Sequence, residues 1–384
     1  DAVDNATPMV GVTPVLDDNL VNFDTESAKV EEAPAEAVIM RSLEPPFRDS
    51  APSQSAILGS PSKTRPPSAI ATKNTRQRME DRHVVLHDLK AYLPSALQAK
   101  VDSEEHVSYY AVFDGHAGTD AAAHAAAHLH EHLIESASYP SDPVEAFTEA
   151  FIKCDEEFVT KSKKSGTTAI CSLIKGEQIF TAWLGDSQAV LSKFVNHLIF
   201  QSLHFLFLLV RNGIPVKIVE AHKPNREDER KRIEALGGTI MHWGTWRVNG
   251  QLAVPEQSVS ITNLCLFLNL NLLNFYSDGE YKPLISAHPD VTTSVNNGSD
   301  EFLIIGCDGL WDTVTPEEAT EIVYVHLEEN KNSGGDIENI GARLATMAKD
   351  KGSGDNITII VVLIKPVEEV IAPGRRHTTG QQPD

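Results

Sequence analysis

Carboxylates in this sequence recur at the ends of apolar, strand-like runs, usually beside a glycine. Asp114 follows the run YAVF, Asp186 follows AWLG, Asp308 follows IIGC, and Asp355 stands directly before NITIIVV. A buried strand fixes the position of the carboxylate at its end, and a neighbouring glycine lets the backbone approach a ligand closely. Several carboxylates that converge repel one another unless they share a cation. A single Asp of this kind would more often close a turn, but four together predict a metal site.

The expected ligands are oxygen atoms, which select hard cations, so Mg²⁺ or Mn²⁺ is favoured over Zn²⁺. Glu80 and Asp81, in the segment TRQRMEDRH, add two further carboxylates. The same segment carries Arg76, Arg78 and Arg82. Because an arginine can grip two phosphate oxygens at once, the segment predicts a site for a metal-bound phosphate. Without the Asp–Gly turns, a salt-bridged surface would be the better interpretation.

Two groups of histidines deserve different interpretations. His116 lies in Asp-Gly-His, two residues after a predicted metal ligand, and a histidine there has a pKa suited to a general acid. His124, His128 and His132 recur every four residues on an Ala-rich helix, where imidazoles could align for a metal. No carboxylate follows at the spacing of zinc proteases, so a polar helix face is favoured.

Several alternative chemistries are excluded by motifs that the sequence lacks. There is no Gly-Lys-Ser/Thr, hence no P-loop, and no Gly-x-Ser-x-Gly nucleophile turn. None of the four cysteines is followed six residues later by Arg, as cysteine phosphatases require.

The formal net charge of −21 opposes binding to nucleic acid or anionic lipid and suits a protein that holds divalent cations or basic partners. The four cysteines have neither disulfide-framework nor zinc-ribbon spacing, which favours a reducing compartment. With no secretory signal in view, we expect a cytoplasmic protein that could equally enter the nucleus.

Strands and helices alternate in the central part of the chain. The runs SYYAVF, QIFTAWL, FLIIGC and NITIIVVLI predict strands. Helices are expected over residues 118–137 and 143–161, from a cap at Asn225 to the glycines at 237–238, from Thr315 onward, and over 337–349.

The expected organisation is a disordered acidic arm over residues 1–68, a folded domain over 69–366 and a flexible tail over 367–384. Two atypical, nearly uncharged segments interrupt the domain at 192–209 and 255–277. Polar residues break up both, so neither is predicted to span a membrane. Joining Leu191 to Val210 would create a β-hairpin with a tight turn at residues 211–213.

Taken in order, these motifs resemble the metal-dependent Ser/Thr protein phosphatases of type 2C, the PPM family. The resemblance runs from about Asn74 to Val362, and NTRQRMEDRHVVL is similar to the calcium/calmodulin-dependent protein kinase phosphatase branch. The matching motifs are Arg76-x-x-x-Glu80-Asp81, Phe113-Asp114-Gly115-His116, Ser165-Gly166-Thr167-Thr168-Ala169, Gly185-Asp186-Ser187, Cys307-Asp308-Gly309 and Asp355-Asn356.

The resemblance implies an α+β fold, a four-layer αββα sandwich of two mostly antiparallel sheets flanked by helices, with metals at one end. It implies hydrolysis of phosphoserine and phosphothreonine in proteins, protein kinases among them, by water activated by two Mg²⁺ or Mn²⁺ ions. The roles implied for single residues are these: Asp114 bridges two ions, Gly115 (through its carbonyl) and Glu80 hold one, Asp308 and Asp355 complete the other, Asp186 favours a third, Arg76 holds the phosphate, and His116 protonates the leaving oxygen.

The chain departs from the family pattern at the two atypical segments. After Trp246-Arg-Val-Asn-Gly-Gln-Leu-Ala-Val the family continues Ser-Arg-Ala-Ile-Gly-Asp, whereas here the pattern resumes only at Asp278. Translated, unspliced intron would have this composition. An alternative is therefore a catalytically impaired product of the same fold that acts only by binding partners. A hydrolase of sugar or nucleotide phosphates is a third and weaker alternative.

Overall fold

The main body of the fold consists of two five-stranded antiparallel sheets. The computed structural model describes residues 66–101, 105–161, 165–194, 213–222, 226–243, 245–248, 286–331 and 337–371. Sheet I contains, in spatial order, β1 (Ser68–Thr72), β14 (Ile357–Leu363), β13 (Asp300–Gly306), β8 (Gln188–Phe194) and β9 (Gly213–Lys217). Sheet II contains β12 (Asp290–Val295), β7 (Gln178–Leu184), β6 (Ala169–Lys175), β3 (Val107–Phe113) and β2 (Arg82–Leu86). Two short pairs accompany them, β4 (Gly115–His116) with β5 (Gly166–Thr167) and β10 (Ile240–Trp243) with β11 (Thr245–Val248).

The central strands are apolar on both faces because each sheet is covered on both sides. In β3, Tyr109 and Phe113 pack in one hydrophobic cluster, whereas Tyr110 and Val112 pack in another. This division follows from the two-residue period of a strand, whose successive side chains point to opposite faces. Because both faces of these strands are apolar, the sequence shows them as continuous apolar runs. One of these runs, QIFTAWL, forms β7.

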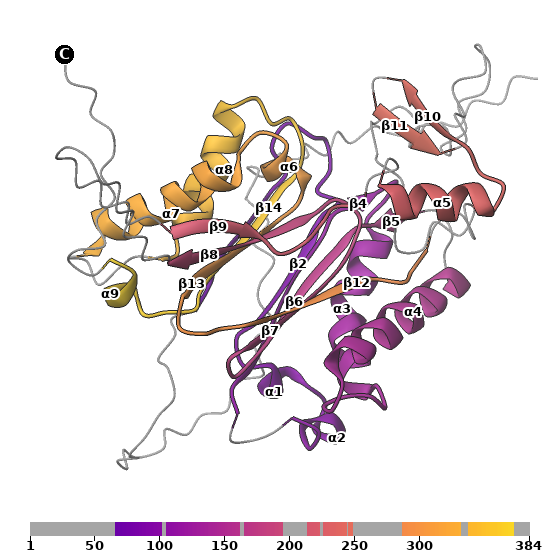
Figure 1. Cartoon of the computed structure of the whole chain (residues 1–384), viewed down its shortest axis with the longest axis horizontal. Helices are drawn as coiled ribbons and strands as arrows, with labels where there is room; N and C mark the ends of the chain where they lie inside the picture. The colour runs from indigo at the N-terminus through magenta and orange to yellow at the C-terminus, as the bar shows by residue number, and fades with distance from the viewer. Residues whose placement is uncertain are drawn as a thin grey trace, which may run out of the picture. The chain divides into compact units, whose positions relative to one another are not determined.

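The two sheets lie face to face, with helices on both outer sides (Figure 1). Tyr110 and Val112 of sheet II share a buried cluster with Leu303 and Ile305 of sheet I. The other face of sheet II packs against helices α3 and α4, and the other face of sheet I against α6, α7, α8 and α9. The predicted four-layer αββα sandwich is therefore confirmed. The helix bounds are α1 Leu89–Tyr92, α2 Ser95–Gln98, α3 Asp120–Glu135, α4 Pro143–Lys161, α5 Glu227–Ala235, α6 Asp308–Trp311, α7 Pro316–Glu329, α8 Ile340–Asp350 and α9 Val367–Val370.

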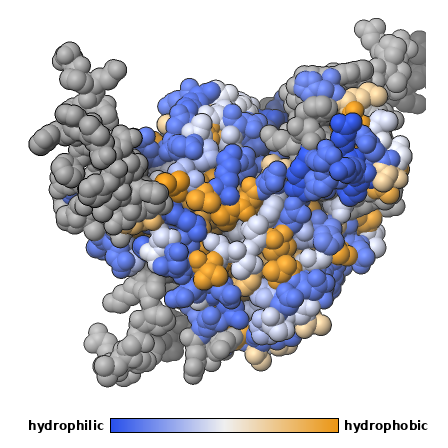
Figure 2. All heavy atoms as spheres, in the orientation of Figure 1, coloured by the Kyte–Doolittle hydropathy of each residue, from blue (hydrophilic) through white to orange (hydrophobic). Residues whose placement is uncertain are grey.

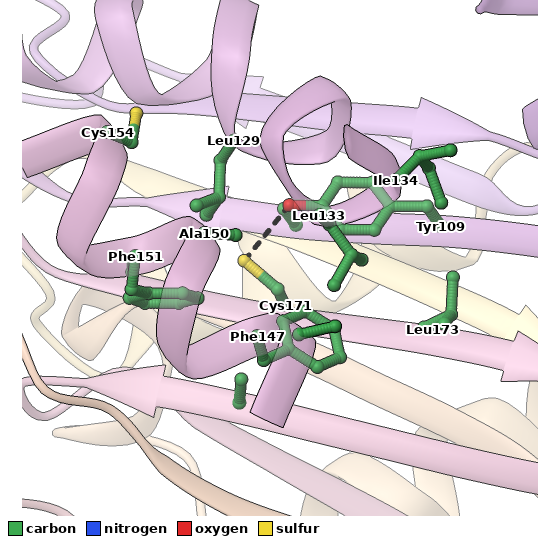
Figure 3. Packing of buried hydrophobic residues seen from close by; sticks show 14 of the residues in the cluster. Tyr109, Leu129, Leu133, Ile134, Phe147, Ala150, Phe151, Cys154, Cys171 and Leu173 are labelled. Atoms are coloured by element: carbon green, nitrogen blue, oxygen red, sulfur yellow. Dashed lines mark hydrogen bonds between the residues drawn. The ribbon is translucent and has the colours of Figure 1, made fainter. Parts of the chain in front are cut away.

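Figure 3 shows the cluster that joins sheet II to α3 and α4. Phe147 and Phe151 of α4 and Leu129 of α3 are fully buried there. The Tyr109 hydroxyl donates to Cys171 Sγ at 3.1 Å, which provides a partner for a polar group far from water. Burial of aromatic and aliphatic groups on this scale is what holds the outer helices to the sheet.

Helix α7 begins as the sequence predicts, with a capping box. The Thr315 hydroxyl accepts from the Glu318 N–H, the Glu318 carboxylate accepts from the Thr315 N–H, and Pro316 occupies the first helical position. The beginning of α8 differs from the prediction. Its first residue is Ile340, because Ile337 packs into the core cluster before the helix starts.

The boundaries of the folded domain need correction at both ends and at one segment. Ser68 already belongs to β1, and its hydroxyl donates to the Glu338 carbonyl at 2.8 Å. Val367 and Val370, assigned to the tail, are buried in α9 because they complete the core of sheet I. Ser192 is also fully buried within β8. The folded domain therefore extends through residue 371, and β8 continues to Phe194.

The expected β8–β9 hairpin is present, although its turn differs from the one predicted. Phe194 pairs directly with Gly213, so Gly213 is a strand residue rather than a turn residue. The remaining predicted turn residues, most of segment 192–209 and all of segment 255–277 lie outside the described residues. None of the helices that the structure describes has the length and apolar character needed to cross a membrane.

The surface seen in Figure 2 is most hydrophilic over α5, whose sequence is EDERKRIEA. Three of its four acidic residues, Glu227, Asp228 and Glu229, lie in its first turn, which suits the positive N-terminal end of the helix dipole. The predicted cap Asn225 lies outside the described residues, and Arg226 occupies the N-cap position.

Candidate metal centre

Carboxylates from both sheets meet at one end of the sandwich. Asp114 follows β3 of sheet II, and Asp308 opens α6 directly after β13 of sheet I. A carboxylate oxygen of each and the Sγ atom of Cys307 all lie within 4.8 Å of one another. Among the residues that the structure describes, no other set of three metal-ligating side chains comes this close.

Strand direction explains why the predicted aspartates share this end. β3 and β7 both pair antiparallel with β6, so Asp114 and Asp186 follow strands that run the same way. β13 and β14 are antiparallel, with Gly306 opposite Ile359, so the end of one strand adjoins the beginning of the other. Asp308, after β13, and Asp355, before β14, therefore lie at the same end of sheet I.

The pKa of Asp114 shows how closely the carboxylates gather. Burial raises this pKa well above its ordinary value, and the charges of Asp308, Asp81, Asp186 and Asp355 raise it further. A like charge acts in this way only from nearby, so the cluster includes all five aspartates. The structure thus brings together five of the carboxylates that the sequence predicted as metal ligands.

Asp308 has the same environment. Burial raises its pKa well above the ordinary value, and the charges of Asp186, Asp355 and Asp312 add to the effect. Its Oδ1 atom is buried without a hydrogen-bond partner. A buried acceptor of this kind is costly, which fits an oxygen whose partner would be a cation.

Asp81 is deeper in the cluster than Glu80. It is 2% exposed, and its Oδ2 atom accepts a hydrogen bond from the Thr358 hydroxyl at 2.7 Å. Burial is the main cause that raises the pKa of Asp81 to about 6. Its Oδ1 atom, like that of Asp308, is buried without a hydrogen bond.

Glycines allow the backbone segments around the cluster to approach one another. A Cβ atom on Gly115 would lie 2.4 Å from the Glu80 carbonyl oxygen, and one on Gly309 would lie 1.9 Å from the Asn356 carbonyl oxygen. Both distances are too short for a real side chain. The sequence pattern of Asp followed by Gly therefore reflects close backbone contact at the site.

The Asn356 side chain links the segment that carries Arg76 and Glu80 to the beginning of β14 by hydrogen bonds. Its Oδ1 atom accepts from the Glu80 N–H at 2.8 Å, and its Nδ2 group donates to the carbonyls of Lys73 and Arg78. The motif Asp355-Asn356 thus combines one charged residue of the site with the residue that positions its neighbours.

Arg76 lies beside the carboxylates, as expected. Its Nη2 group donates to Asp355 Oδ2 at 2.6 Å, and both side chains are partly exposed. The other two arginines of the segment do not join this contact. Arg82 donates to the carbonyls of Met79 and Asp81, and the Arg78 carbonyl accepts from Asn356 Nδ2. These residues therefore stabilise the conformation of the loop.

His116 is 4% exposed and belongs to β4, where it pairs with Gly166 of β5. The short β4–β5 ladder also holds Asp114, because the Thr167 hydroxyl and the Thr168 N–H both donate to the Asp114 carbonyl. The motif SGTTA therefore fixes the backbone that carries Asp114 and His116.

Cys307 belongs to the motif Cys307-Asp308-Gly309, but no role in the site was predicted for the thiol itself. The Thr358 N–H donates to its Sγ atom at 3.2 Å, and the thiol donates to the Asn356 carbonyl at 3.5 Å. Burial, followed by the charges of Asp81, Asp114 and Asp308, raises the pKa of this thiol well above its usual value. Cys307 therefore stays a neutral thiol, and the charged donors of the site are oxygens.

This donor set fits a hard divalent cation. The carboxylates repel one another and two of their oxygens are buried without partners, which bound cations would correct. In α3, both ring nitrogens of His132 contact glutamates, Glu135 and Glu157. Among the described residues, the α3 histidines form no set of three metal-ligating side chains as close as the one at Asp114 and Asp308.

Comparison with known proteins places the chain in a family. A family model described as Protein phosphatase 2C matches residues 67–357. The chain belongs to the protein phosphatase 2C family. The family expected from the motifs is therefore confirmed.

Two relatives illustrate the similarity. The chain is 38% identical over 305 residues to "Protein phosphatase 1E" of Mus musculus, which covers 78% of this chain and 35% of that protein. It is 36% identical over 310 residues to "Protein phosphatase 1F" of Homo sapiens, covering 80% of this chain and 58% of that protein. The chain thus spans about a third to three fifths of the length of these relatives.

A solved structure supports the fold. The crystal structure of serine-threonine phosphatase 2C from Toxoplasma gondii matches with a TM-score of 0.60 at 17% identity, covering 78% of this chain and 97% of that chain. At this identity the likeness concerns the fold alone.

Proposed function

We propose that the chain is a metal-dependent protein phosphatase that hydrolyses phosphoserine and phosphothreonine. The observation that carries the proposal is the approach of Asp114 and Asp308, from two different sheets, to within 4.8 Å, in a family of protein phosphatases. Partly buried carboxylates in such contact are suited to divalent cations rather than to a structural role.

The ions we propose are Mg²⁺ or Mn²⁺, two in number, with a third at Asp186. Asp114 would contact both principal ions, Glu80 and the Gly115 carbonyl would hold one, and Asp308 and Asp355 the other. Asp81, held by its hydrogen bond from Thr358, would add negative charge beside Asp114. Cations held there supply Lewis acidity that lowers the pKa of water and neutralises phosphate charge.

Arg76 would bind the phosphate group of the substrate. A guanidinium carries five N–H donors, so an Arg76 that contacts Asp355 through Nη2 can present other donors to phosphate oxygens. The contact with Asp355 would thus orient the guanidinium at the edge of the carboxylate cluster.

His116 would donate a proton to the seryl or threonyl oxygen as it leaves. The β4–β5 pairing fixes the backbone of His116 one residue after Gly115 and two after Asp114. A general acid must be held in place relative to the reacting group, and this short ladder provides that restraint.

The proposed substrates are phosphorylated proteins, with protein kinases among the candidates. The net charge of −21 favours basic sequences around the phosphorylated residue. We also propose a cytoplasmic location that extends to the nucleus.

The direct test is hydrolysis of a phosphothreonine peptide by the purified chain, with Mn²⁺ and with excess chelator. The proposal predicts turnover that requires Mn²⁺ and is restored when the chelator is titrated with Mn²⁺. Turnover that persists in chelator would contradict it, as would folded protein that is inactive under both conditions.

A second candidate function is binding without catalysis, because the atypical segments interrupt the family pattern. Against it, the first segment follows Phe194, the last residue of β8. The carboxylates lie at the other end of this strand, where Gln188 pairs with Gly306. Six residue steps of strand separate those ends by about 20 Å. The second segment precedes β12, whose first residue Asp290 pairs with Trp183 near the Gly185 turn. We therefore expect any impairment to arise from the second segment.

A further inference from the structure

Both backbone polar groups of Gly185, the residue before Asp186, are bonded to one histidine. The Gly185 N–H donates to His222 Nδ1 at 3.2 Å, and the His222 N–H donates to the Gly185 carbonyl at 2.9 Å. His222 is fully buried. It comes from the segment after β9, so it reaches the turn from a part of the chain that carries no predicted site residue.

The hydrogen bonds define the state of the His222 ring. A backbone N–H can only donate, so Nδ1 must accept and carries no proton. Nε2 is then the protonated nitrogen, and it donates to Asp290 Oδ2 at 3.0 Å. Arg226 also donates to that oxygen, at 2.8 Å. Asp290 thereby holds His222 in the one tautomer that can accept from Gly185.

Thr168 packs against the same turn. Gly185 has a φ of +96°, and a Cβ atom there would lie 2.7 Å from Thr168 Cγ2. The Thr168 hydroxyl contacts the Ser187 hydroxyl at 2.8 Å and accepts from the Asp114 N–H at 3.3 Å. The turn that carries Asp186 is therefore restrained by His222 directly and by the Asp114 backbone through Thr168.

We propose that His222, held by Asp290, is a positioning residue that aims the Asp186 carboxylate at a divalent cation. The inference rests on the proposed function, since it assumes that the carboxylate cluster binds such cations. His222 does not touch the cation. It sets the affinity of the site that includes Asp186 by restraining the backbone one residue away, as outer partners of metal ligands do.

Two conservative substitutions distinguish the positioning role of His222 from a contribution of its side-chain packing alone. In His222→Asn the side-chain oxygen can take the place of Nδ1 and accept from Gly185, while the contact with Asp290 is lost. In His222→Gln the longer amide can reach Asp290, while the acceptor for Gly185 is lost. The matched control is His130→Gln, which replaces a histidine of α3 that is 8% exposed and lies beside Tyr109.

The experiment is a titration of metal-free protein with Mn²⁺, in which electron paramagnetic resonance measures unbound Mn²⁺ and circular dichroism confirms folding. We expect His222→Gln to weaken the site that includes Asp186 by about 10- to 100-fold. Binding at the other sites should persist. His222→Asn and His130→Gln should bind as the wild type does. In an Asp186→Asn background, His222→Gln should cause no further loss.

The outcomes distinguish failure of the positioning role of His222 from failure of the proposed function. Folded His222→Gln protein that binds Mn²⁺ as the wild type does would overturn the positioning role alone. Equal weakening in His222→Asn, His222→Gln and His130→Gln would also overturn it, because loss of packing would then explain the effect. A folded wild-type chain that bound no Mn²⁺ would overturn the proposed function and this inference with it.

Discussion

The carboxylates of Asp114 and Asp308 lie within 4.8 Å of each other although the two residues follow strands of different sheets. Burial is the largest cause that raises the pKa of both, the charge of Asp308 raises that of Asp114 further, and the charges of Asp186 and Asp355 raise that of Asp308 further. The contact therefore links the packing of the two sheets to the charge state of the site. A cation that relieves the repulsion should stabilise the sandwich as well as create the chemistry.

The first prediction concerns Asp308→Asn in metal-free protein. Because the folded-state pKa of Asp308 is raised, its ionisation destabilises the fold, and that cost grows as pH rises from the ordinary pKa of an aspartate toward the raised one. The variant should therefore be more stable than the wild type at pH 7.5, by an amount that shrinks toward pH 5. Urea unfolding at several pH values measures the difference.

The variant must be compared with the wild type at each pH, because buried histidines lower the stability of both proteins as pH falls. Burial lowers the pKa of His130 to about 4, so protonation in the unfolded chain destabilises the fold in acid, equally in both proteins. The control is Asp300→Asn at the other end of β13, where Asp300 pairs with Lys193 at 3.3 Å. That variant should be destabilised at pH 7.5. A destabilised Asp308→Asn at this pH would be evidence against the repulsion.

The second prediction concerns Arg76→Ala. Loss of a charge-assisted grip on phosphate, worth about 1.5–3 kcal/mol, should raise KM for a phosphopeptide at least about tenfold. Arg343→Ala provides a control, since Arg343 is another partly exposed arginine paired with a glutamate, Glu329, on the outer helices. Steady-state kinetics should separate the two variants, and equal KM values would remove Arg76 from the phosphate site.

The third prediction concerns the close approach at Gly309. Gly309→Ala would place a Cβ atom 1.9 Å from the Asn356 carbonyl oxygen, so the loop bearing Asp355 or the start of α6 must shift. We expect a loss of about 1–3 kcal/mol of unfolding free energy and weaker Mn²⁺ binding. Gly354→Ala, whose added Cβ would meet nothing closer than 3.5 Å, should change neither. Similar results for both variants would show that the contact is not restrictive.

The fourth prediction separates the two atypical segments. Phe194 and Gly213 are paired residues, so a short Asn-Gly turn can replace residues 195–212 without changing the register of β8 and β9. This replacement should leave the turnover number nearly unchanged. Exchange of residues 255–277 for Ser-Arg-Ala-Ile-Gly should raise it, since that segment precedes the strand beside the Gly185 turn.

The same segments make a prediction about RNA. If they are retained introns, transcripts that lack both should be recoverable from the source of the sequence. Amplification across each segment checks this, and finding both in every transcript would refute the intron hypothesis.

Much of the fold could be predicted because the central strands are apolar on both faces and end in recognisable Asp–Gly turns. β7 and α4 form where the sequence places them. Edge strands were harder, since β9 and β12 are partly exposed and mix polar with apolar residues. The tail was misjudged at Val367 because a single short turn of helix leaves little periodicity to read.

The charged residues of the site were predictable from residue type, whereas their supporting contacts were not. Cys307 stands in a recognised motif, but only the structure shows that its thiol contacts Asn356 and Thr358 beside the carboxylates. His222 and Asp290 are 68 residues apart, and no local pattern joins them to Gly185. Such contacts depend on tertiary packing, which spacing along one chain does not reveal.

The central claim is that carboxylates of both sheets share divalent cations through Asp114. Equilibrium dialysis of metal-free protein against Mn²⁺ counts the ions bound by the wild type and by Asp114→Asn. The account predicts two principal ions in the wild type and simultaneous weakening of both in the variant, because one residue contacts both. Unchanged stoichiometry and affinity in folded Asp114→Asn protein would contradict it.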